Sequence, residues 1–392
     1  MELNLGYKQT EAGVIPEEWQ ISYVGVEFDI KLGKMLDAEK NIGVPKLYLG
    51  NRAVQWGKID ISDLASVRLS HSDLSRFRLK KGDLLVCEGG EVGRAAIWEA
   101  PLPECYYQKA LHRLRPIKKY DPLLMLYVLM YWSDRGKLTN YVTQTSIAHL
   151  TREKFEVVPL LLPPLPEQRA IAAALSDMDT LLAAQDQLIA KKRDIKQAVM
   201  QQLLTGKQRL PGFSGEWEVK RLGKLARITK GQQLNRAELS LADEFPAWNG
   251  GMEPSGFTDI WNTLENTITI SEGGNSCGFV GFVKQKFWCG GHCYALLDVS
   301  TELDRTFLYF LLKCKQSLIM SLRMGSGLPN IQRKYLSELP LSYPPIPEQA
   351  AIAAVLSDMD SEIDALRQRR DKTQMLKQGM MQELLTGRTR LV

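Results

Sequence analysis

The sequence has no long apolar run and few cysteines for its length. No stretch approaches the roughly eighteen apolar residues that a membrane span needs, and the start, MELNLGYKQTEAG, lacks the basic beginning and apolar centre of a signal peptide. The six cysteines among 392 residues are too sparse for a disulfide framework. We therefore expect a cytoplasmic protein with reduced thiols.

The common catalytic motifs are also missing. The chain contains no GxxxxGK[ST] phosphate loop, no GxGxxG at a helix start, no GxSxG elbow and no HExxH. It lacks the Asn-Pro-Pro-aromatic motif of amino-methyltransferases and the carboxylate pair with Glu-x-Lys of many restriction nucleases. The four histidines, His71, His112, His149 and His292, are scattered, which is typical of structural or solvated histidines. The sequence favours a chain without an active site.

One cluster of metal-binding residue types is present. The segment CGGHC, from Cys289 to Cys293, with Cys277 nearby, offers three thiols and an imidazole that can ligate zinc. Its spacing is not that of a standard finger or ribbon, and the adjacent His292 and Cys293 are awkward paired ligands on a strand. We favour incidental or buried thiols and predict no metal site, which metal analysis of the purified chain tests.

The composition is that of an ordinary globular protein. It is 44% hydrophobic and 24% charged, and its length suggests two or three domains. The net charge of +5 is only mildly basic and does not by itself identify a nucleic-acid binder.

One segment occurs twice. PPLPEQRAIAAALSDMD, from Pro163 to Asp179, returns as PPIPEQAAIAAVLSDMD, from Pro344 to Asp360. With a shift of 181 residues the copies stay in register without a gap to Leu210 and Leu391, and more than half of these positions are identical. The preceding segments, SIAHLTREKFEVVPLLLPP and GLPNIQRKYLSELPLSYPP, share this register. The duplicated unit is therefore larger than the segment itself.

Each copy has the pattern of a long helix. It begins with prolines and a Glu-Gln pair in the first turn, and it ends at LLTG, where Gly206 or Gly387 suits the left-handed position after a helix. Apolar residues at a three-four spacing form one seam, which predicts a long helical partner. The seam residues are Ile171, Leu175, Met178, Leu182 and Ile189, then Ile352, Leu356, Met359, Ile363 and Leu366, with Gln185, Lys192, Arg370 and Thr373 as polar interruptions that can fix register.

The linker length predicts how the helices pair. A helix of about 39 residues spans roughly 58 Å. The roughly ten residues between Thr205 and the next domain start at Phe213 to Trp217 reach at most about 35 Å, too little to return along that helix. We expect an antiparallel two-helix coiled coil with one globular domain at each end and an approximate two-fold axis between them.

The two globular parts are predicted to be divergent copies of one α/β domain with a mixed or antiparallel sheet. Both contain glycine-broken strand patterns, LLVCEGGEVGRAAIW and ITISEGGNSCGFVGFV, in which Glu-Gly-Gly indicates a tight hairpin turn. Both also contain a helix preceded by an aspartate, Asp121 or Asp304. The segments between these patterns differ. The predicted boundaries are 1–162 and 211–343 for the domains, and 163–210 and 344–392 for the helices.

Basic residues cluster with aromatics and amides in four places. These are RFRLKK, CYYQKALHRLR, KRLGKLARITK and GSGLPNIQRK. Lys and Arg can contact phosphates, whereas Arg, Asn and Gln can read base edges. For any single cluster a solvated surface is the favoured interpretation, but the clusters together favour a nucleic-acid ligand.

With these features the chain resembles a known family, the specificity (S) subunits of type I restriction-modification systems. The resemblance covers essentially the whole chain. It rests on the PPxPEQxxIAxxLSxxD helices ending in LLTG, on the opening YKQTEAGVIPEEW from Tyr7 to Trp19, and on the alternation of variable domain and long helix.

The resemblance implies a non-catalytic chain with two target recognition domains, each reading one half of a split, asymmetric sequence in double-stranded DNA. It implies that the helices set the half-site spacing and dock two modification (M) subunits, which use S-adenosylmethionine to methylate adenine N6. A motor-nuclease (R) subunit can join. We expect no cofactor bound by this chain itself.

Candidate residues follow from these patterns. The phosphate candidates are Arg76, Arg78, Lys80 and Lys81. The base-reading candidates are Glu88, Gly89, Gly90, Glu91, Arg94, Tyr106, Tyr107, Gln108 and Lys109 in the first domain, and Asn249, Gly273, Gly274, Asn275, Ser276, Asn330, Gln332 and Arg333 in the second. The spacer and partner candidates are Glu167, Gln168, Leu175, Met178, Leu182, Glu348, Gln349, Leu356, Met359 and Ile363.

Two alternatives stay open. A coiled-coil scaffold could join other proteins without touching DNA, and duplex binding by the complex with its partner subunits would distinguish the two. The chain could also be the specificity component of a related fused restriction enzyme, which gene neighbourhood would reveal.

Overall fold

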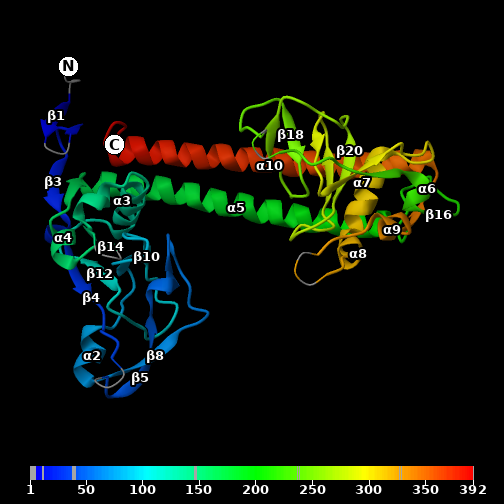
Figure 1. The fold of residues 1–392 in the computed structure, drawn as a ribbon. Coiled ribbons are helices and arrows are strands. Elements are labelled where there is room, and N and C mark those ends of the chain that lie inside the picture. Colours follow the sequence, from blue (N-terminus) through cyan, green and yellow to red (C-terminus); the bar gives the residue numbers. More distant parts are fainter. Residues whose placement is uncertain are drawn as a thin grey trace. The chain divides into compact units, whose positions relative to one another are not determined.

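The fold is seen in a computed structural model that describes residues 6–391, apart from 11–12, 38–40, 145–147, 236, 238, 326 and 328. The chain forms two compact units. The first unit comprises Met1–Gln185 and Arg369–Val392, and the second comprises Asp186–Gln368. Each unit contains an α/β part and a section of each of the two long helices, α5 (Leu165–Leu203) and α10 (Ile346–Leu385), which are green and red in Figure 1.

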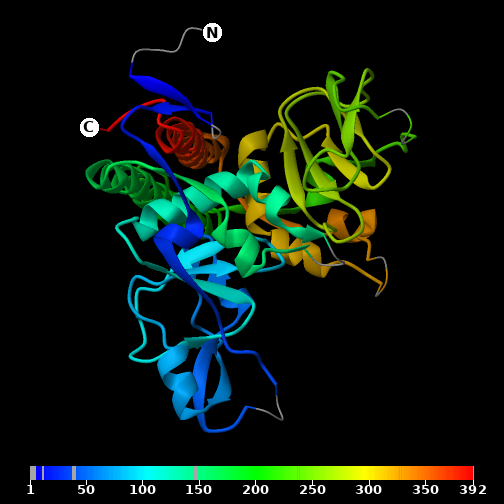
Figure 2. The same cartoon turned by 90° about the vertical axis from the view of Figure 1, so that its left-hand side faces the viewer.

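Two sheets form the α/β part of the first unit. One is antiparallel, with order β10-β9-β12-β4 (Ala95–Ile97, Leu84–Cys87, Leu111–Pro116 and Phe28–Leu32). The other is mixed, with order β11-β5-β8 (Tyr106–Tyr107, Val44–Leu49 and Ala65–Leu69), because β11 pairs with β5 in parallel. These strands lie in the blue to cyan part of the ribbon in Figures 1 and 2.

Short strand pairs and helices complete the first unit. The pairs are β1 (Tyr7–Thr10) with β2 (Gly13–Pro16), β3 (Gln20–Tyr23) with β15 (Pro159–Leu162), β6 (Val54–Gln55) with β7 (Lys58–Ile59), and β13 (Thr143–Gln144) with β14 (Ala148–His149). The helices are α1 (Val24–Glu27), α2 (His71–Arg76), α3 (Pro122–Asp134) and α4 (Arg152–Glu156), with the 3-10 turns η1 (Asn51–Ala53) and η2 (Lys137–Tyr141).

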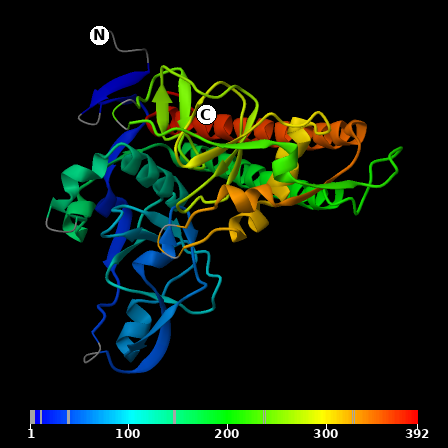
Figure 3. The ribbon, with the colours of Figure 1, turned by 45° about the vertical axis from the view of Figure 1, so that its right-hand side comes forward.

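The second unit repeats this plan in the green to orange part of the ribbon in Figure 3. Its antiparallel sheet has order β21-β20-β23-β17 (Val280–Val283, Thr267–Ser271, Cys293–Leu297 and Arg227–Lys230), and its mixed sheet has order β22-β18-β19 (Trp288–Cys289, Phe245–Trp248 and Gly256–Thr258). Strand β16 (Glu218–Arg221) pairs with β24 (Pro340–Tyr343), and the helices are α6 (Leu222–Leu225), α7 (Arg305–Cys314), α8 (Gln316–Ser321) and α9 (Arg333–Ser337).

Strand order confirms that the two α/β parts are copies of one domain. Each antiparallel sheet joins its four strands in the same sequence of neighbours, and each mixed sheet contains one parallel pair, β5 with β11 or β18 with β22. Both predicted caps are present, since Asp121 accepts from the backbone of α3 and Asp304 from that of α7. The predicted α/β class is correct, and where the sequence indicated a mixed or an antiparallel sheet, each domain contains one of each.

The Glu-Gly-Gly segments differ from the prediction in one respect. They do lie in hairpins, since β9 pairs with β10 and β20 with β21. However, the connections run over residues 88–94 and 272–279 and are therefore open loops, not tight turns. Their length leaves room for side chains that a two-residue turn could not carry.

The long helices begin and end where the sequence predicted. Gly206 and Gly387 have φ values of 70° and 73°, the left-handed conformation that ends a helix. Within the first unit, Gln185 Nε2 on α5 donates to Thr373 Oγ1 on α10 over 3.2 Å, and Lys377 pairs with Asp179 at 2.5 Å. Residue numbers rise along one helix as they fall along the other, so the paired sections are antiparallel, and Figure 2 shows them side by side.

The second unit contains the reciprocal pairing. Lys192 on α5 pairs with Glu362 on α10 at 2.6 Å, and Lys196 pairs with Asp360. The predicted seam is largely buried: Ile171, Leu175, Leu182, Ile189, Ile352, Leu356 and Ile363 are inside, and Met178, Met359 and Leu366 are half-buried. None of the helices in the described ranges is long and apolar enough to cross a membrane.

Candidate nucleic-acid interface

The loop after β9 in the first unit is attached to a distant segment of the chain. The amide of Leu150 donates to Glu88 O over 2.8 Å, and Gly89 forms an antiparallel bridge with His149. Asn51 Nδ2 donates to Gly89 O over 3.1 Å. Two distant segments therefore anchor the start of the loop at residues 88–94.

Arg94 helps to hold this loop. Its Nη2 donates to Asn51 O over 3.1 Å, and it pairs with Glu91 at 3.2 Å, while Trp56 Nε1 donates to the other Glu91 oxygen over 2.6 Å. The Arg94 side chain is 15% exposed, and its Nε is buried without a hydrogen-bond partner. Arg94 therefore positions the loop, and Gly90 and Glu91 are its exposed residues.

The loop after β20 in the second unit is held in the same way. The amide of Ile331 donates to Glu272 O over 2.8 Å, Gly273 bridges to Asn330, and the amide of Gly274 donates to Pro329 O over 3.1 Å. Ser276 Oγ donates to Gly250 O over 2.5 Å. The neighbouring Asn249 accepts through Oδ1 from the amide of His292 over 3.2 Å. The structure thus brings together the predicted residues Asn249, Gly273, Gly274, Ser276 and Asn330.

Glu272 is the charged centre of the second loop. Its carboxylate accepts from Lys230 Nζ over 2.7 Å and from Tyr294 Oη over 3.1 Å. Burial and the adjacent Glu272 charge raise the pKa of Tyr294 to about 12, so its hydroxyl stays a hydrogen-bond donor at neutral pH. Lys230 is half-exposed and Asn275 is exposed, which leaves both able to contact a ligand.

Three residues near the first loop, Asn51, Trp56 and His149, were not among the predicted ones. His149 lies against Gly89 as Asn330 lies against Gly273, and the repeat register of 181 residues places His149 on Asn330. The repeat register therefore could have identified His149 as the equivalent of the predicted residue Asn330, although the histidines alone showed no pattern. No local pattern indicated Asn51 or Trp56, because both are distant from the loop in the sequence and reach it only in the folded chain.

Tyr106 and Tyr107 require a correction. They are 1% and 0% exposed and belong to a core cluster with Leu49, Leu85 and Trp98, so neither ring can contact bases in this conformation. Burial raises the pKa of Tyr107 to about 12. The physical reason is that β11 lies beside β5 with its rings turned inward. Of the neighbouring candidates, Gln108 is half-buried and Lys109 is exposed.

The basic segment RFRLKK alternates between surface and core. Its four basic residues, Arg76, Arg78, Lys80 and Lys81, are exposed, whereas Phe77 and Leu79 are buried. The Arg76 guanidinium lies 5.1 Å from the Phe77 ring centroid, and Lys81 makes only a loose, exposed pair with Glu99 at 3.7 Å. Arg78 Nη2 also donates to Pro103 O over 3.2 Å, but all four side chains are exposed and can contact phosphates. In the second unit, Gln332 and Arg333 are exposed at the start of α9.

The repeated Glu-Gln pairs have a structural role within each unit. Gln168 Oε1 accepts from the amide of Asp121, and Gln349 Oε1 from that of Asp304, each over 2.8 Å. These bonds attach the start of each long helix to the start of α3 or α7. All four of these spacer and partner candidates, Glu167, Gln168, Glu348 and Gln349, are at most 2% exposed, so they stabilise each unit from within.

The cysteine cluster is buried, and its histidine is not. Cys277, Cys289 and Cys293 lie in the interior, and the proximity of Cys289 raises the pKa of the Cys293 thiol. His292 has a side chain that is 63% exposed and lies 3.9 Å from Glu272. Across the part of the chain that the structure describes, no group of three or more His, Cys, Asp or Glu residues is arranged to hold a metal ion.

Comparison with known proteins agrees with this arrangement. The sequence model of the type I restriction modification DNA specificity domain matches twice, over residues 16–191 and 214–374. A Methanocaldococcus jannaschii protein described as the MjaX type I restriction enzyme specificity subunit is 26% identical over 98% of this chain and 97% of its own length. A Mycoplasma pneumoniae protein described as a type I specificity subunit is 33% identical over 44% of this chain and 46% of its own.

Solved structures share the fold. The crystal structure of a type I restriction-modification S subunit from M. genitalium superposes with a TM-score of 0.64 at 20% identity, covering 98% of both chains. A chain from a study of assembly and conformational transition in the type I system gives the same TM-score at 18% identity, covering 96% of this chain and 99% of that one.

Two copies of a DNA specificity domain define a DNA-recognition protein. The chain belongs to the family of specificity subunits of type I restriction-modification systems. Members of this family are non-catalytic and act together with modification and restriction subunits on DNA. The absence of catalytic motifs from the sequence agrees with this role.

Proposed function

We propose that each α/β domain reads one half of a bipartite, asymmetric DNA target. The observation that carries this proposal is the pair of loops at residues 88–94 and 272–279, which occupy equivalent places in one strand order and share Glu-Gly-Gly but differ in the residues that follow. A common framework with different loops provides two different readings. The recognition domains extend over 1–162 and 211–343 in this proposal.

The two long helices act as the spacer between the half-sites. Antiparallel contacts in both units support a coiled coil along their full length, over segments 163–210 and 344–392. The buried hydrogen bond between Gln185 and Thr373 supports a single register, because a shifted pairing would leave the buried Gln185 Nε2 without its acceptor. The length of the helices then determines the distance between the half-sites. Two related domains would contact half-sites about one DNA turn, roughly 34 Å, apart.

The exposed faces of the helices dock two modification subunits, through which the motor-nuclease subunit joins. In the second unit, Leu188 and Ile195 on α5 are 40% and 41% exposed, and in the first unit Met375 and Leu376 on α10 are 63% and 59% exposed. Large apolar side chains in solvent at these positions support contact with another protein. S-adenosylmethionine serves the modification subunits, and this chain holds no cofactor.

The test is a domain exchange in the assembled complex. Residues 211–343 are replaced by the equivalent domain of a relative, and the methylated sequence is determined by methylome sequencing in a host that carries the matching modification subunit. We expect one half of the target to change while the other half and the spacing persist. A change in both halves, or methylation without a split target, contradicts the proposal.

A further inference from the structure

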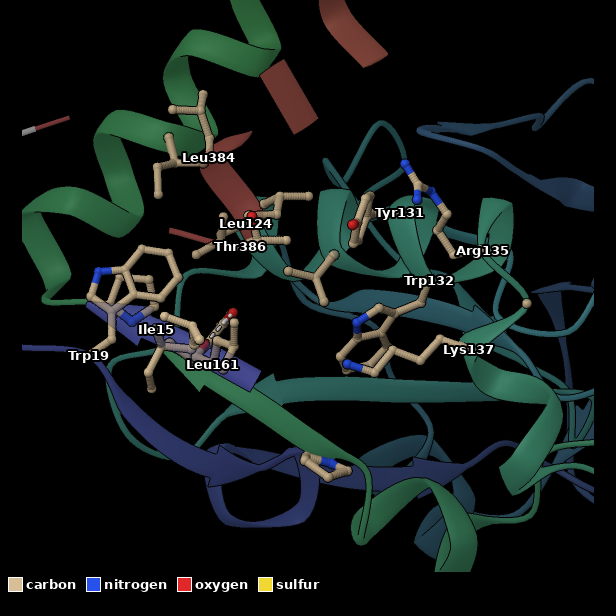
Figure 4. A pocket seen from close by; sticks show the side chains of 18 of the residues that line it. Ile15, Trp19, Leu124, Tyr131, Trp132, Arg135, Lys137, Leu161, Leu384 and Thr386 are labelled. Atoms are coloured by element: carbon tan, nitrogen blue, oxygen red, sulfur yellow. Dashed lines mark hydrogen bonds between the residues drawn. The ribbon is translucent and has the colours of Figure 1, made fainter. Parts of the chain in front are cut away.

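A cavity of about 580 Å³ lies in the first unit, beside the corner where α3 turns into η2. Several parts of the chain line it: the segment around β2, helix α3 with η2, strand β15 with the start of α5, and the end of α10 (Figure 4). None of the residues discussed as DNA contacts lines it. Its volume is within the range of small-molecule sites.

The interior of the cavity is apolar and aromatic. Trp19, Trp132 and Leu124 form its walls with Ile15 and Leu384, and all five are buried. Figure 4 shows these side chains around the cavity. Burying an apolar group against such walls is favourable, and flat rings favour a flat ligand.

The rim of the same cavity is cationic. Arg135 and Lys137 lie on either side of Gly136, whose φ of 62° turns the chain so that both border the cavity. The Arg135 guanidinium lies 5.4 Å from the Tyr131 ring centroid, and Lys137 Nζ lies 5.2 Å from that of Trp132.

These cations are not neutralised by the protein. The residues that line the cavity include no carboxylate. Among the described residues, neither Arg135 nor Lys137 forms an ion pair; Arg135 instead donates to the uncharged Gln382 over 2.5 Å. Asn140 adds an uncharged polar group to this rim. Unpaired positive charge around an apolar interior suits a ligand with an apolar body and an anionic group.

We propose that this cavity is a binding site for an aromatic or apolar anion, that is, a carboxylate, sulfonate or phosphate carried on a flat or branched apolar group. The apolar part enters between Trp19, Leu124 and Trp132, and the anion rests between Arg135 and Lys137. The ligand chemistry can come from a free small molecule or from an acidic, apolar segment of a partner subunit.

The test uses two fluorescent probes of one shape. Anilinonaphthalene sulfonate carries the anion, and N-phenylnaphthylamine is the same ring system without it. Both are titrated against the full chain under native conditions. We expect saturable binding of one sulfonate probe per chain, with the neutral probe binding about tenfold more weakly because it lacks the charge-assisted contacts.

Variants locate the site. Arg135→Glu and Lys137→Glu should each weaken the sulfonate probe about fivefold and leave the neutral probe unchanged. Asn140→Trp, at an exposed position on the rim, should block both probes. Lys119→Glu, an exposed lysine of the same unit outside the cavity, is the matched control and should change neither affinity.

Equal binding of the two probes, or the same effect from Lys119→Glu as from Lys137→Glu, overturns the proposal, as does unchanged binding to Asn140→Trp. Addition of the modification subunit then identifies the source of the natural ligand. Release of the bound sulfonate probe assigns the site to a segment of that subunit, whereas retention assigns it to a free small molecule. Because no arm of this test uses DNA, its result is independent of the proposed half-site reading.

Discussion

Arg390 donates from Nε and Nη2 to the two carboxylate oxygens of Glu167, over 2.6 and 2.9 Å, although the residues stand at the end of the chain and at the start of α5. Glu167 is completely buried and also accepts from Trp19 Nε1 over 2.9 Å. In the second unit Arg209 makes the same two-pronged contact with the buried Glu348. In each unit, an ion pair therefore joins the segment after the end of one long helix to the first turn of the other.

Removing Arg390 should destabilise the first unit. Arg390→Met leaves the Glu167 carboxylate buried with a single donor, and loss of one partner from a buried pair costs about 3 kcal/mol. Urea unfolding followed by tryptophan fluorescence measures the change. Arg388→Met is the control, since Arg388 makes an exposed pair with Glu383 at 3.6 Å and should change stability by less than about 0.5 kcal/mol. Equal losses of unfolding free energy in the two variants would show that the buried pair stabilises the unit no more than an exposed pair does.

Lengthening both helices should change the half-site spacing. Four residues inserted into each helix, opposite one another within 182–189 and 366–373, lengthen the pair by about 6 Å, on the order of two base-pair steps. Methylome sequencing should show altered spacing between unchanged half-sequences. An insertion in α5 alone separates Gln185 from Thr373 and should abolish assembly. Unchanged spacing in the double insertion would refute the spacer role.

Neutralising the basic segment should weaken DNA binding without altering the target. Arg76, Arg78, Lys80 and Lys81 are exposed, and phosphate contacts are independent of sequence. Substitution of each by Gln should lower the affinity of the assembled complex for all duplexes. The slope of log affinity against log salt should decrease by about 0.9 for each lost contact. Lys119→Gln serves as the control, and a changed methylation motif would argue that these residues read bases.

Lys313 should make the stability of the second unit depend on pH. Its Nζ donates to Val280 O and Gln316 Oε1, each over 2.9 Å, and burial, with the nearby Lys196 charge, lowers its pKa to about 8. The unfolded chain keeps a pKa near 10.5 and therefore binds more protons between about pH 8 and pH 10.5. The stability contribution of Lys313 should rise across that window and stay constant below it.

Urea unfolding of the wild type and of Lys313→Met between pH 7 and pH 10 isolates this contribution. Because other groups titrate equally in both proteins, the difference between the two unfolding free energies reports Lys313 alone. We expect the wild type to gain stability relative to the variant from pH 8 upwards. A constant difference would show that the pKa of Lys313 is not lowered.

The sequence by itself determined the long helices and the duplication. Helix periodicity, first-turn carboxylates and terminal glycines act over a few residues, so α5 and α10 begin and end where the pattern indicated. Asp121 and Asp304 were recognisable as caps for the same reason. Comparison of the chain with itself added the repeat register of 181 residues, which links His149 to Asn330.

Only the tertiary structure decided which side chains face solvent at the candidate site. Both RFRLKK and CYYQK combine basic and aromatic residues, yet the basic residues of the first are exposed while Tyr106 and Tyr107 of the second are buried. Their burial follows from the parallel pairing of β11 with β5, two strands far apart in the chain. Likewise, the sequence placed the repeated Glu-Gln pairs in the first turn of each long helix, but only the fold shows that Arg390 and Asp121 contact them. Local patterns specify which elements form, whereas the contacts between distant elements determine which residues remain free to bind.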